Sequence, residues 1–356
     1  MSVAARRIDV LVVDDSRLMR RMIGDILAGM EMVGNVAFAP DALSARRQIV
    51  ERRPDVITLD VEMPDLDGLK FLDQLMARMP LPVVMVSAIT SRGAEATLRA
   101  LERGAVDVVA KPTGLDGMQG FRGALVDAVA RAAGARVGGG RAPAPVVPLR
   151  PPPVSRAPRR ADIVGIAAST GGVTALAAVL PGLPPDAPPC LVTQHMPAAF
   201  LTRLAARLRA RLHRDVAVAR EGERLEHGMI RFAPGHRHLM PLERDAGMVT
   251  TLSDMPAPMG HTPSADLMFE GIARLRRPAL GIILTGMGRD GAAGLRAMRD
   301  AGAATMGQDA RSCVVYGMPR AAAELGALDE VLPPEAIAER LSTFWQPSPR
   351  KVSDII

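Results

Sequence analysis

Two groups of side chains that could accept or bind a phosphoryl group lie in the first third of the chain. Each of them follows an apolar run. The carboxylates are Asp14, Asp15 and Asp60, and a hydroxyl and an ammonium group follow two further runs as Ser87 and Lys111. Neighbouring carboxylates repel one another unless a hard divalent cation joins them, and Mg²⁺ prefers such oxygen ligands. A lysine offsets negative charge, and a small hydroxyl can bind an incoming phosphoryl oxygen. The set therefore predicts a site at which a carboxylate is phosphorylated.

A different set of reactive side chains follows apolar runs in the second half of the chain. Ser169 precedes Thr-Gly-Gly, His195 precedes Met-Pro, and Asp290 closes a glycine-rich turn. These are the groups of Ser–His–Asp catalysis, in which His195 would accept the proton of Ser169 and Asp290 would fix the imidazole tautomer. The glycines after Ser169 permit a sharp turn from strand to helix. They also leave backbone N–H groups at a helix N-terminus, where an oxyanion is favoured.

Each member of this second set also has an ordinary explanation when taken alone. Ser169 fits a helix N-cap or a phosphate-binding loop, His195 a structural histidine, and Asp290 the N-cap of a helix predicted at 292–300. The order Ser…His…Asp differs from that of the α/β-hydrolases, and no GxSxG is present. The other histidines are expected on loops or helix faces: His213, His227, His236, His238 and His261.

The elements that must position the first set are five units of strand and helix. Helical patterns occupy 16–29, 41–52, 68–78, 91–103 and 119–133, and each follows an apolar run. Continuously apolar strands that alternate with helices indicate a parallel sheet covered on both faces. Ligands of such sheets bind beyond the carboxyl ends of the strands, where the polar residues stand. We predict a (βα)5 domain over 8–133, with strands at Ile8–Val13, Met32–Phe38, Val56–Leu59, Val83–Val86 and Val106–Ala110.

The second set requires another α/β domain, which we predict over 161–345. Buried parallel strands are expected at Ile163–Ala168, Cys190–Gln194 and Leu280–Leu284, each with a helical stretch near it. Between 215 and 260 the apolar runs are shorter and are separated by Gly and Pro; they are Val216–Ala219, Met229–Ala233 and Met248–Leu252. This pattern suggests hairpins at a sheet edge. The expected fold is therefore doubly wound and mainly parallel, of hydrolase type, with an edge hairpin region.

The stretch 134–160 is rich in Gly and then in Pro, has no helical or strand period, and is predicted to be a linker. It holds six arginines and no acid, which accounts for the net charge of +6 of the whole chain. The flanking regions are close to neutral, so neither has the basic face of a nucleic-acid binder.

Hydropathy and cysteine content indicate where the protein is expected to be located in the cell. No apolar run approaches the ~18 residues of a membrane span, and the N-terminus lacks the apolar core of a signal peptide. The expected location is therefore the cytoplasm, without membrane insertion. The two cysteines, Cys190 and Cys313, have no metal-ligand spacing and are expected to be buried free thiols.

Residues 8–133 resemble a response-regulator receiver domain. The matching stretches are DD, LDVEMPDLDG, VSA and KP. The resemblance implies that Asp60 is the phosphoacceptor, that Asp14 and Asp15 hold Mg²⁺ with it, and that Ser87 and Lys111 contact the phosphoryl group. It also implies a histidine kinase as phosphodonor. Many receivers carry an aromatic switch residue three positions before the lysine, where this chain has Val108, so the resemblance does not extend to activation by an aromatic swing.

Residues 161–335 resemble the catalytic domain of the chemotaxis protein-glutamate methylesterase family, CheB. The matching stretches are GIAASTGG, TQHMP, FAPGHRHL, HTPSADLMF, LTGMGRDG and SCVVYGMP. The resemblance implies a triad of Ser169, His195 and Asp290, with the backbone N–H groups of Thr170 and Met287 as oxyanion donors. It further implies a phosphorylation-activated enzyme that hydrolyses glutamate methyl esters on methylated chemoreceptors, releasing methanol, and deamidates receptor glutamines in chemotactic adaptation. No cofactor is expected in this domain.

Two other readings of the second domain are weaker. A receiver can control a nucleic-acid-binding output, but nothing in 161–356 resembles a helix-turn-helix. A nucleotide-binding Rossmann domain also has glycine-rich loops after strands. That fold requires GxGxxG directly after its first strand, where this chain has Ser-Thr-Gly-Gly from Ser169 onward. It also requires an acidic residue at the end of the second strand, where this chain has His195.

Overall fold

The computed structural model describes residues 7–63, 68–88, 90–114, 117–137 and 161–344. The chain divides into two compact units, Met1–Ala142 and Pro143–Ile356. The predicted linker lies outside the described residues from 138 to 160. Residue 345, the predicted end of the second domain, also lies outside them. So do residues 64–67, which belong to the LDVEMPDLDG stretch.

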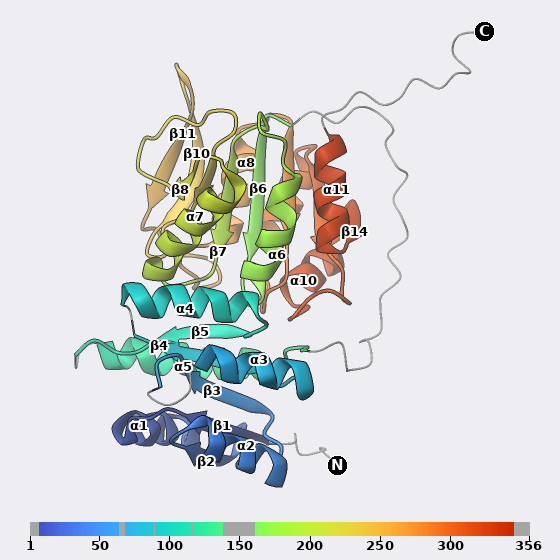
Figure 1. The fold of residues 1–356 in the computed structure, drawn as a ribbon. Helices are drawn as coiled ribbons and strands as arrows, with labels where there is room; N and C mark the ends of the chain where they lie inside the picture. Colours follow the sequence, from blue (N-terminus) through green and yellow to red (C-terminus); the bar gives the residue numbers. More distant parts are fainter. Residues whose placement is uncertain (1–6, 64–67, 89, 115–116, 138–160, 345–356) are drawn as a thin grey trace. The chain divides into compact units, whose positions relative to one another are not determined.

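The first unit is a five-stranded parallel sheet with the strand order β2-β1-β3-β4-β5 (Figure 1). This order is that of a flavodoxin-like doubly wound sheet, so the predicted fold class is confirmed. Two strands extend one residue further than predicted, so that Asp60 and Ser87 are their last residues. The elements are β1 (Ile8–Val13), α1 (Arg17–Ala28), β2 (Val33–Ala39), α2 (Ala42–Glu51), β3 (Val56–Asp60), α3 (Gly68–Arg78), β4 (Val83–Ser87), α4 (Ser91–Glu102), β5 (Asp107–Ala110) and α5 (Gly117–Ala133).

Side-chain caps begin several helices just past the carboxyl ends of these strands. Ser16 Oγ accepts a hydrogen bond from the Met19 N–H at the start of α1 (3.4 Å), and Asp41 Oδ1 accepts from the Ser44 N–H at the start of α2 (2.7 Å). Such caps satisfy N–H groups that the first turn of a helix leaves without partners. They fix where each helix starts and therefore how long the preceding loop is.

The second unit contains a seven-stranded, wholly parallel sheet in the order β14-β13-β12-β6-β7-β9-β8. In Figure 1, α6 and α7 lie in front of this sheet and α8 behind it. The central elements are β6 (Ile163–Ala168), α6 (Gly172–Val179), η1 (Leu180–Gly182), β7 (Cys190–Gln194), α7 (Ala198–Leu212), α8 (Ala265–Arg274), β12 (Ala279–Ile283) and α9 (Ala292–Asp300). The outer elements are β8 (Val216–Val218), β9 (Ile230–Phe232), β13 (Ala304–Gln308), α10 (Met318–Glu324), β14 (Glu330–Leu332) and α11 (Pro334–Phe344).

The edge of this sheet differs from the prediction. Strands β8 and β9, expected to take part in a hairpin, pair in parallel and extend the main sheet. The hairpin is formed instead by β10 (His238–Arg244) and β11 (Gly247–Ser253), which make a separate two-stranded antiparallel sheet. A run of three apolar residues does not reveal the direction of its neighbour, because parallel and antiparallel edges bury the same residue types. The prediction was therefore right about strands β8, β9 and β11, missed β10, and was wrong about how β8 and β9 pair.

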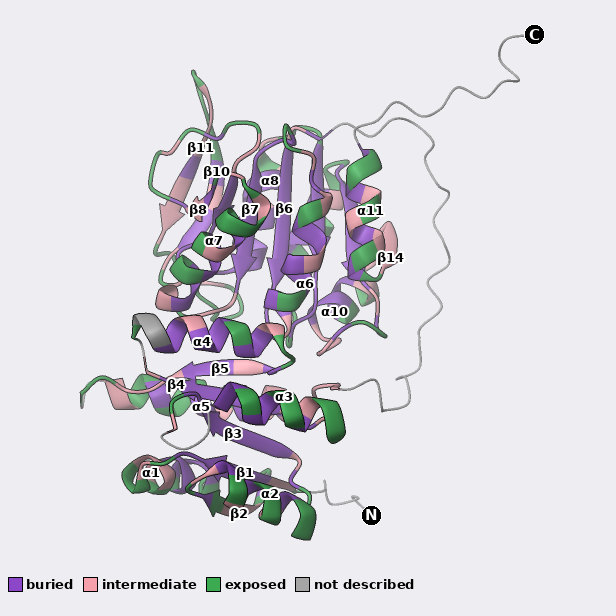
Figure 2. Cartoon of the chain, in the orientation of Figure 1, coloured by how far each residue is buried: buried purple, intermediate pink, exposed green. Residues whose placement is uncertain are grey.

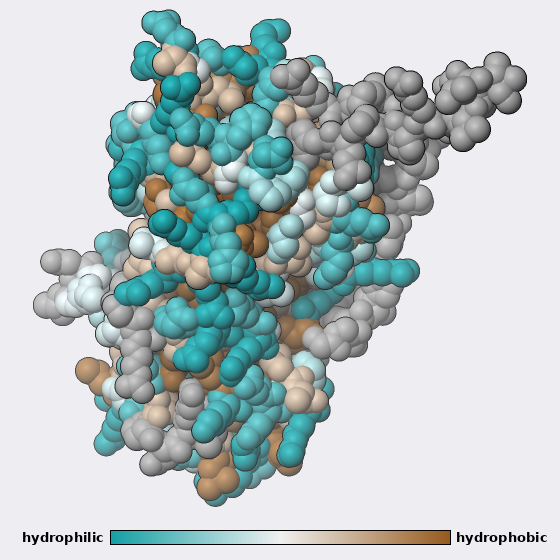
Figure 3. Space-filling view, turned by 45° about the horizontal axis from the view of Figure 1, so that its top comes forward, coloured by the Kyte–Doolittle hydropathy of each residue, from teal (hydrophilic) through white to brown (hydrophobic). Residues whose placement is uncertain are grey.

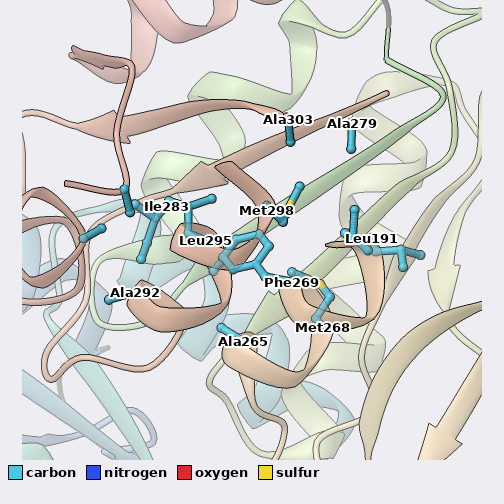
Figure 4. Packing of buried hydrophobic residues seen from close by; sticks show 14 of the residues in the cluster. Leu191, Ala265, Met268, Phe269, Ala279, Ile283, Ala292, Leu295, Met298 and Ala303 are labelled. Carbon is cyan, nitrogen blue, oxygen red and sulfur yellow. The ribbon is translucent and has the colours of Figure 1, made fainter. Parts of the chain in front are cut away.

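The inner strands of the main sheet, β6, β7, β12 and β13, are buried on both faces, as their purple colour in Figure 2 shows. Figure 4 shows the packing behind the sheet, where Phe269 of α8 lies beside Leu295 and Met298 of α9. The two helices can approach this closely because residue 294 is a glycine. A Cβ at that position would lie only 2.5 Å from the Asp266 carbonyl oxygen. This close approach sets the start of α8 against the loop that leads into α9.

Hydrophilic and hydrophobic residues are unevenly distributed over the face shown in Figure 3. Hydrophilic side chains predominate there, with smaller hydrophobic patches between them. Among the described residues, no helix is both long enough and apolar enough to cross a membrane.

Candidate active site

Ser169 and His195 directly follow two paired strands of the main sheet. The last residues of β6 and β7, Ala168 and Gln194, are partners in the parallel register, and the His195 N–H donates to the Ala168 carbonyl (3.1 Å). On the other side of β6, the Ser169 N–H donates to the carbonyl of Thr285, which follows β12 (3.0 Å). Three neighbouring strands therefore bring these residues to one edge of the sheet, as the sequence predicted from the strand ends.

A tight turn carries the chain from Ser169 into α6. The Gly172 N–H donates to the Ser169 carbonyl (2.8 Å), and Gly171 has φ 78°, a conformation that side-chain-bearing residues rarely adopt. A Cβ on Gly171 would also lie 2.6 Å from the Cβ of Val314. The turn therefore needs glycine for both backbone conformation and space. Ser169 and Thr170 at its start are buried, with 8% and 4% of their surface exposed.

His195 and Asp290 are joined by a hydrogen bond. The distance between His195 Nε2 and Asp290 Oδ2 is 2.8 Å, and the Asp290 side chain is fully buried. A carboxylate at this distance favours the tautomer with the proton on Nε2. That tautomer leaves Nδ1 unprotonated and able to accept a proton. The His–Asp part of the predicted set is thus formed.

Three further donors from the start of α8 converge on Asp290. Ser264 Oγ donates to Oδ1 (2.9 Å), the Ala265 N–H to Oδ2 (2.7 Å) and the Asp266 N–H to Oδ1 (3.0 Å). Burial on its own would raise the pKa of Asp290. The hydrogen bond and charge of His195, together with these backbone donors, outweigh burial and lower the pKa to about 2. Asp290 is therefore a stable carboxylate and not a proton acceptor at neutral pH.

A second buried carboxylate, which the sequence analysis missed, stands behind the first. Burial and the negative charge of Asp290 together raise the pKa of Asp266 to about 6, although hydrogen bonds from the N–H groups of Gly294 and Gly291 oppose the rise. The Gly294 N–H donates to Asp266 Oδ1 (2.8 Å). In the HTPSADLMF stretch, Asp266 stands where acidic residues are common, in the first turn of a helix. Nothing in the sequence therefore indicates that this carboxylate is buried beside the site.

Sequence reasoning also missed two side chains that contact the predicted residues. Gln194 is buried and its Nε2 donates to the carbonyls of Ser169 (2.9 Å) and His195 (3.2 Å), which ties the two segments together. The ring of His261, which was expected to lie on a loop or helix face outside the site, is stacked on that of His195. A lone histidine in a segment rich in Pro and Gly gives no sign of such a contact.

The predicted oxyanion donors lie next to Ser169. A Cβ on Gly286 would be 2.7 Å from Ser169 Cβ, so the backbone leading into Met287 runs directly past the serine. The Met287 side chain is 44% exposed, at the surface of the site. Among the described residues no acceptor for the Ser169 hydroxyl is found, so the structure brings Ser169 beside the His–Asp pair without a hydrogen bond between Oγ and the imidazole.

The first unit gathers its predicted residues around Lys111. Lys111 Nζ lies 2.7 Å from Asp60 Oδ2 and 2.9 Å from Asp14 Oδ2. Burial raises the pKa of Asp60, and Lys111 only partly opposes this rise. Burial would lower the pKa of Lys111, but its pairing with Asp60 and Asp14 raises it overall. The ammonium group is therefore charged and offsets two buried carboxylates.

The acidic cluster fits a hard divalent cation. Asp14, Asp15 and Asp60 each offer a carboxylate oxygen, and these atoms lie within 4.8 Å of one another. Oxygen donors of this kind suit Mg²⁺, and the exposure of Asp15 leaves room for water ligands. Ser87 lies buried at the neighbouring strand end, where its hydroxyl donates to the Ala88 carbonyl (3.3 Å).

Comparison with known proteins identifies both units. Residues 164–341 match the family model described as CheB methylesterase, and residues 10–120 match the response regulator receiver domain. A relative from Anaeromyxobacter dehalogenans, named protein-glutamate methylesterase/protein-glutamine glutaminase 4, is 47% identical over 94% of this chain and 94% of its own. A relative with the same enzyme name from Agrobacterium fabrum is 47% identical over 96% of this chain and 97% of its own.

The chain belongs to the CheB methylesterase family. Among solved structures, the catalytic domain of Thermotoga maritima CheB methylesterase is 33% identical, covers 51% of this chain and 98% of its own, and has a TM-score of 0.49. As a CheB methylesterase, the chain is a hydrolase that also carries a receiver domain. The resemblance stated from the motifs is thereby confirmed.

Proposed function

We propose that this protein is a phosphorylation-activated protein-glutamate methylesterase that serves chemotactic adaptation. The observation that carries the proposal is the 2.8 Å contact between His195 Nε2 and the buried Asp290, at the strand end beside Ser169. The curated relatives that match nearly the whole chain carry the corresponding enzyme name. The substrates are methylated glutamates of chemoreceptors, and receptor glutamines are deamidated at the same site.

The ester is cleaved in two steps that use one serine. His195 Nδ1 takes the proton from Ser169 while Oγ bonds to the ester carbonyl carbon, and the carbonyl oxygen becomes an oxyanion. The carbon–methoxy bond then breaks, and the proton on the imidazolium goes to the departing methanol. Water attacks the acyl-serine by the reverse use of His195, which releases the free glutamate and restores Ser169. With glutamine as substrate, ammonia leaves in place of methanol.

Backbone N–H groups of Thr170 and Met287 stabilise the oxyanion. Support comes from the placement of Thr170 at the start of the turn into α6 and from the approach of Gly286 to Ser169. A helix N-terminus favours negative charge, and preorganised donors act at the point where charge develops. Asp290 keeps His195 in the tautomer that leaves Nδ1 free, and its charge stabilises the imidazolium.

The receiver domain takes a phosphoryl group on Asp60 from a histidine kinase. An oxygen of Asp60 bonds to phosphorus as the bond from phosphorus to the donor breaks. Lys111, 2.7 Å from Asp60 Oδ2, and Ser87 bind oxygens of the transferred group. Asp14, Asp15 and Asp60 would hold Mg²⁺, which supplies positive charge for the transfer. Val108, buried in β5, stands where many receivers have an aromatic residue, so the switch is expected to use other groups.

The proposed division of the chain is a receiver domain at 8–133, a linker at 134–160 and a catalytic domain at 161–345. The two matched families fall inside these limits, and the boundary between the compact units falls inside the linker. We place the protein in the cytoplasm, where the kinase and the methylated part of the receptors would be available to it.

The test is methanol release from methylated receptor membranes, with and without acetyl phosphate and Mg²⁺. Wild-type protein is expected to release methanol faster with the phosphodonor, and Ser169→Ala to release none. Ser342→Ala is a matched control, because Ser342 is exposed near the end of α11, where its hydroxyl donates to the Glu339 carbonyl (2.7 Å). Methanol release by Ser169→Ala at the wild-type rate would place the nucleophile elsewhere.

A further inference from the structure

The ring of His261 covers one face of the His195 imidazole. The ring centroids are 4.8 Å apart and the planes are inclined by 15°, which is a stacked arrangement. His261 is an exposed residue just before α8, whereas His195 follows β7. Stacked rings at this separation attract one another and prefer a defined relative orientation. The contact therefore joins the segment after β7 to the segment before α8, at the histidine of the candidate triad.

The hydrogen bond to Asp290 does not by itself fix the orientation of His195. A single contact at Nε2 holds one edge of the ring, and the ring can still tilt about the line between Nε2 and Asp290 Oδ2. Such a tilt moves Nδ1, the nitrogen that must meet the Ser169 hydroxyl. A second ring against the face of the imidazole opposes the tilt, because tilting would break the stack.

The segment that carries His261 is itself held in place. His238 is buried, its Nδ1 accepts from the Ser264 N–H (2.9 Å) and its Nε2 donates to the Met255 carbonyl (2.8 Å). Ser264 Oγ in turn donates to Asp290. The same short segment thus presents a ring to His195 and a hydroxyl to Asp290, so the two contacts move together.

We propose that His261 is a positioning residue for His195. Its ring opposes tilting of the imidazole and so keeps Nδ1 available to the Ser169 hydroxyl, and it takes no part in proton transfer. This inference rests on the proposed function for its effect on rate, but the orientation of the His195 ring can be measured without any substrate. The role requires a flat ring at position 261 and does not require an imidazole.

The kinetic test compares His261→Ala with His261→Phe in the full-length chain, using a small glutamate methyl ester. The alanine variant is expected to lose roughly 3- to 10-fold in kcat with KM unchanged, the range given by the usual strength of a stacked aromatic pair. The phenylalanine variant is expected to stay within about twofold of wild type. His213→Asn is the matched control, because His213 is an exposed histidine at the far end of α7 and asparagine tolerates its φ of 51°.

The substrate-free test follows the Nε2–H proton of His195 by NMR in ¹⁵N-histidine-labelled protein. The signal is expected to broaden in His261→Ala and to stay sharp in His261→Phe and His213→Asn. Two results would overturn the proposal: wild-type kcat and an unchanged signal in His261→Ala, or equal losses in the alanine and phenylalanine variants. If Ser169→Ala still hydrolyses the ester, the proposed function fails, and the NMR comparison alone still decides the role of His261.

Discussion

At the scale of single residues, Asp290 is the most constrained group of the candidate site. Its two oxygens accept from His195, Ser264, Ala265 and Asp266. A carboxylate can accept all four because both of its oxygens carry lone pairs and neither carries a proton. An amide of the same shape has only one oxygen, so it must turn an NH2 group toward at least one of these donors.

We therefore expect Asp290→Asn to lower both activity and stability. A wrong imidazole tautomer costs roughly 10⁴ in rate in the serine-protease template, and a loss of this order is expected in ester hydrolysis. A backbone donor left without an acceptor costs about 1–3 kcal/mol of unfolding free energy. Asp245→Asn, in the exposed turn between β10 and β11, is the control for a surface carboxylate. Hydrolysis above a tenth of the wild-type rate would contradict the assigned role.

Asp266 predicts a distinct dependence of stability on pH. Its pKa is raised to about 6 in the folded chain, against 3.8 as its ordinary value. Between these pH values the folded state holds a proton that the unfolded state has lost, so the free energy of unfolding falls as pH rises through this window. The fall should amount to about 1–3 kcal/mol.

Asp266→Asn should remove this fall, because an amide does not ionise and can still accept from the Gly294 N–H through its oxygen. Urea unfolding of both proteins from pH 4 to pH 7 measures the difference. The wild type should lose stability relative to the variant as pH rises. Parallel pH profiles would show that Asp266 is not titrating in this window.

At the scale of elements, the turn between β6 and α6 is the feature most sensitive to substitution. Gly171 and Gly302 both have a left-handed φ, of 78° and 93°, but a Cβ on Gly302 would meet open space. Gly302→Ala should therefore cost only backbone strain, about 1–2 kcal/mol. Gly171→Ala adds a contact of 2.6 Å with Val314 and should cost more, with a loss of esterase activity. Thermal unfolding and ester hydrolysis compare the two, and equal effects would contradict this reading of the turn.

The elements that position the site were predictable because they are buried on both faces. Strands such as β6 and β7 are buried at every position and are built mainly from apolar residues, and their predicted bounds match the observed ones. The short edge strands were found, but their pairing was not, because three residues carry no signal of direction. Strands β13 and β14 were not predicted at all. Contacts from distant segments, such as His261 on His195, depend on how loops fold and have no local pattern in the sequence.

The residues of the candidate site were predictable from a simple rule. Asp60, Ser169 and His195 all lie at or just after the carboxyl end of a buried parallel strand, where ligands bind in such sheets. The other donors to Asp290, beside His195, could not be foreseen in this way. They come from the N-terminus of α8, and that helix reaches the site only because the close approach at Gly294 places it there.

At the scale of the whole molecule, we expect the unphosphorylated receiver domain to restrain the hydrolase. Interfaces between domains of one chain tend to be modest and partly polar, so a phosphoryl group can shift their equilibrium. A differential preference of ~1–3 kcal/mol would give roughly 5- to 150-fold activation. Protease cleavage within 134–160 should release a fragment near 161–356 that hydrolyses esters faster than the intact unphosphorylated chain and ignores acetyl phosphate.

Two variants separate restraint from other routes of activation. Asp60→Asn in the intact chain should keep the low basal rate and lose stimulation, and Asp55→Asn, on the opposite end of β3, should still respond. Labelling by acetyl phosphate should require Mg²⁺ and Asp60. If the released fragment is no faster than the intact chain, the receiver must act positively, for example by docking the enzyme on its receptor.

The donors at the start of α8 have a consequence for how the protein exchanges hydrogen with solvent. The first N–H groups of a helix normally face water and exchange quickly, because no carbonyl of the helix can accept from them. Here the N–H groups of Ala265 and Asp266 donate to a fully buried carboxylate. Their deuterium uptake should therefore be as slow as that of the neighbouring strands. These two amides would report opening of the catalytic centre in the resting enzyme, before any substrate arrives.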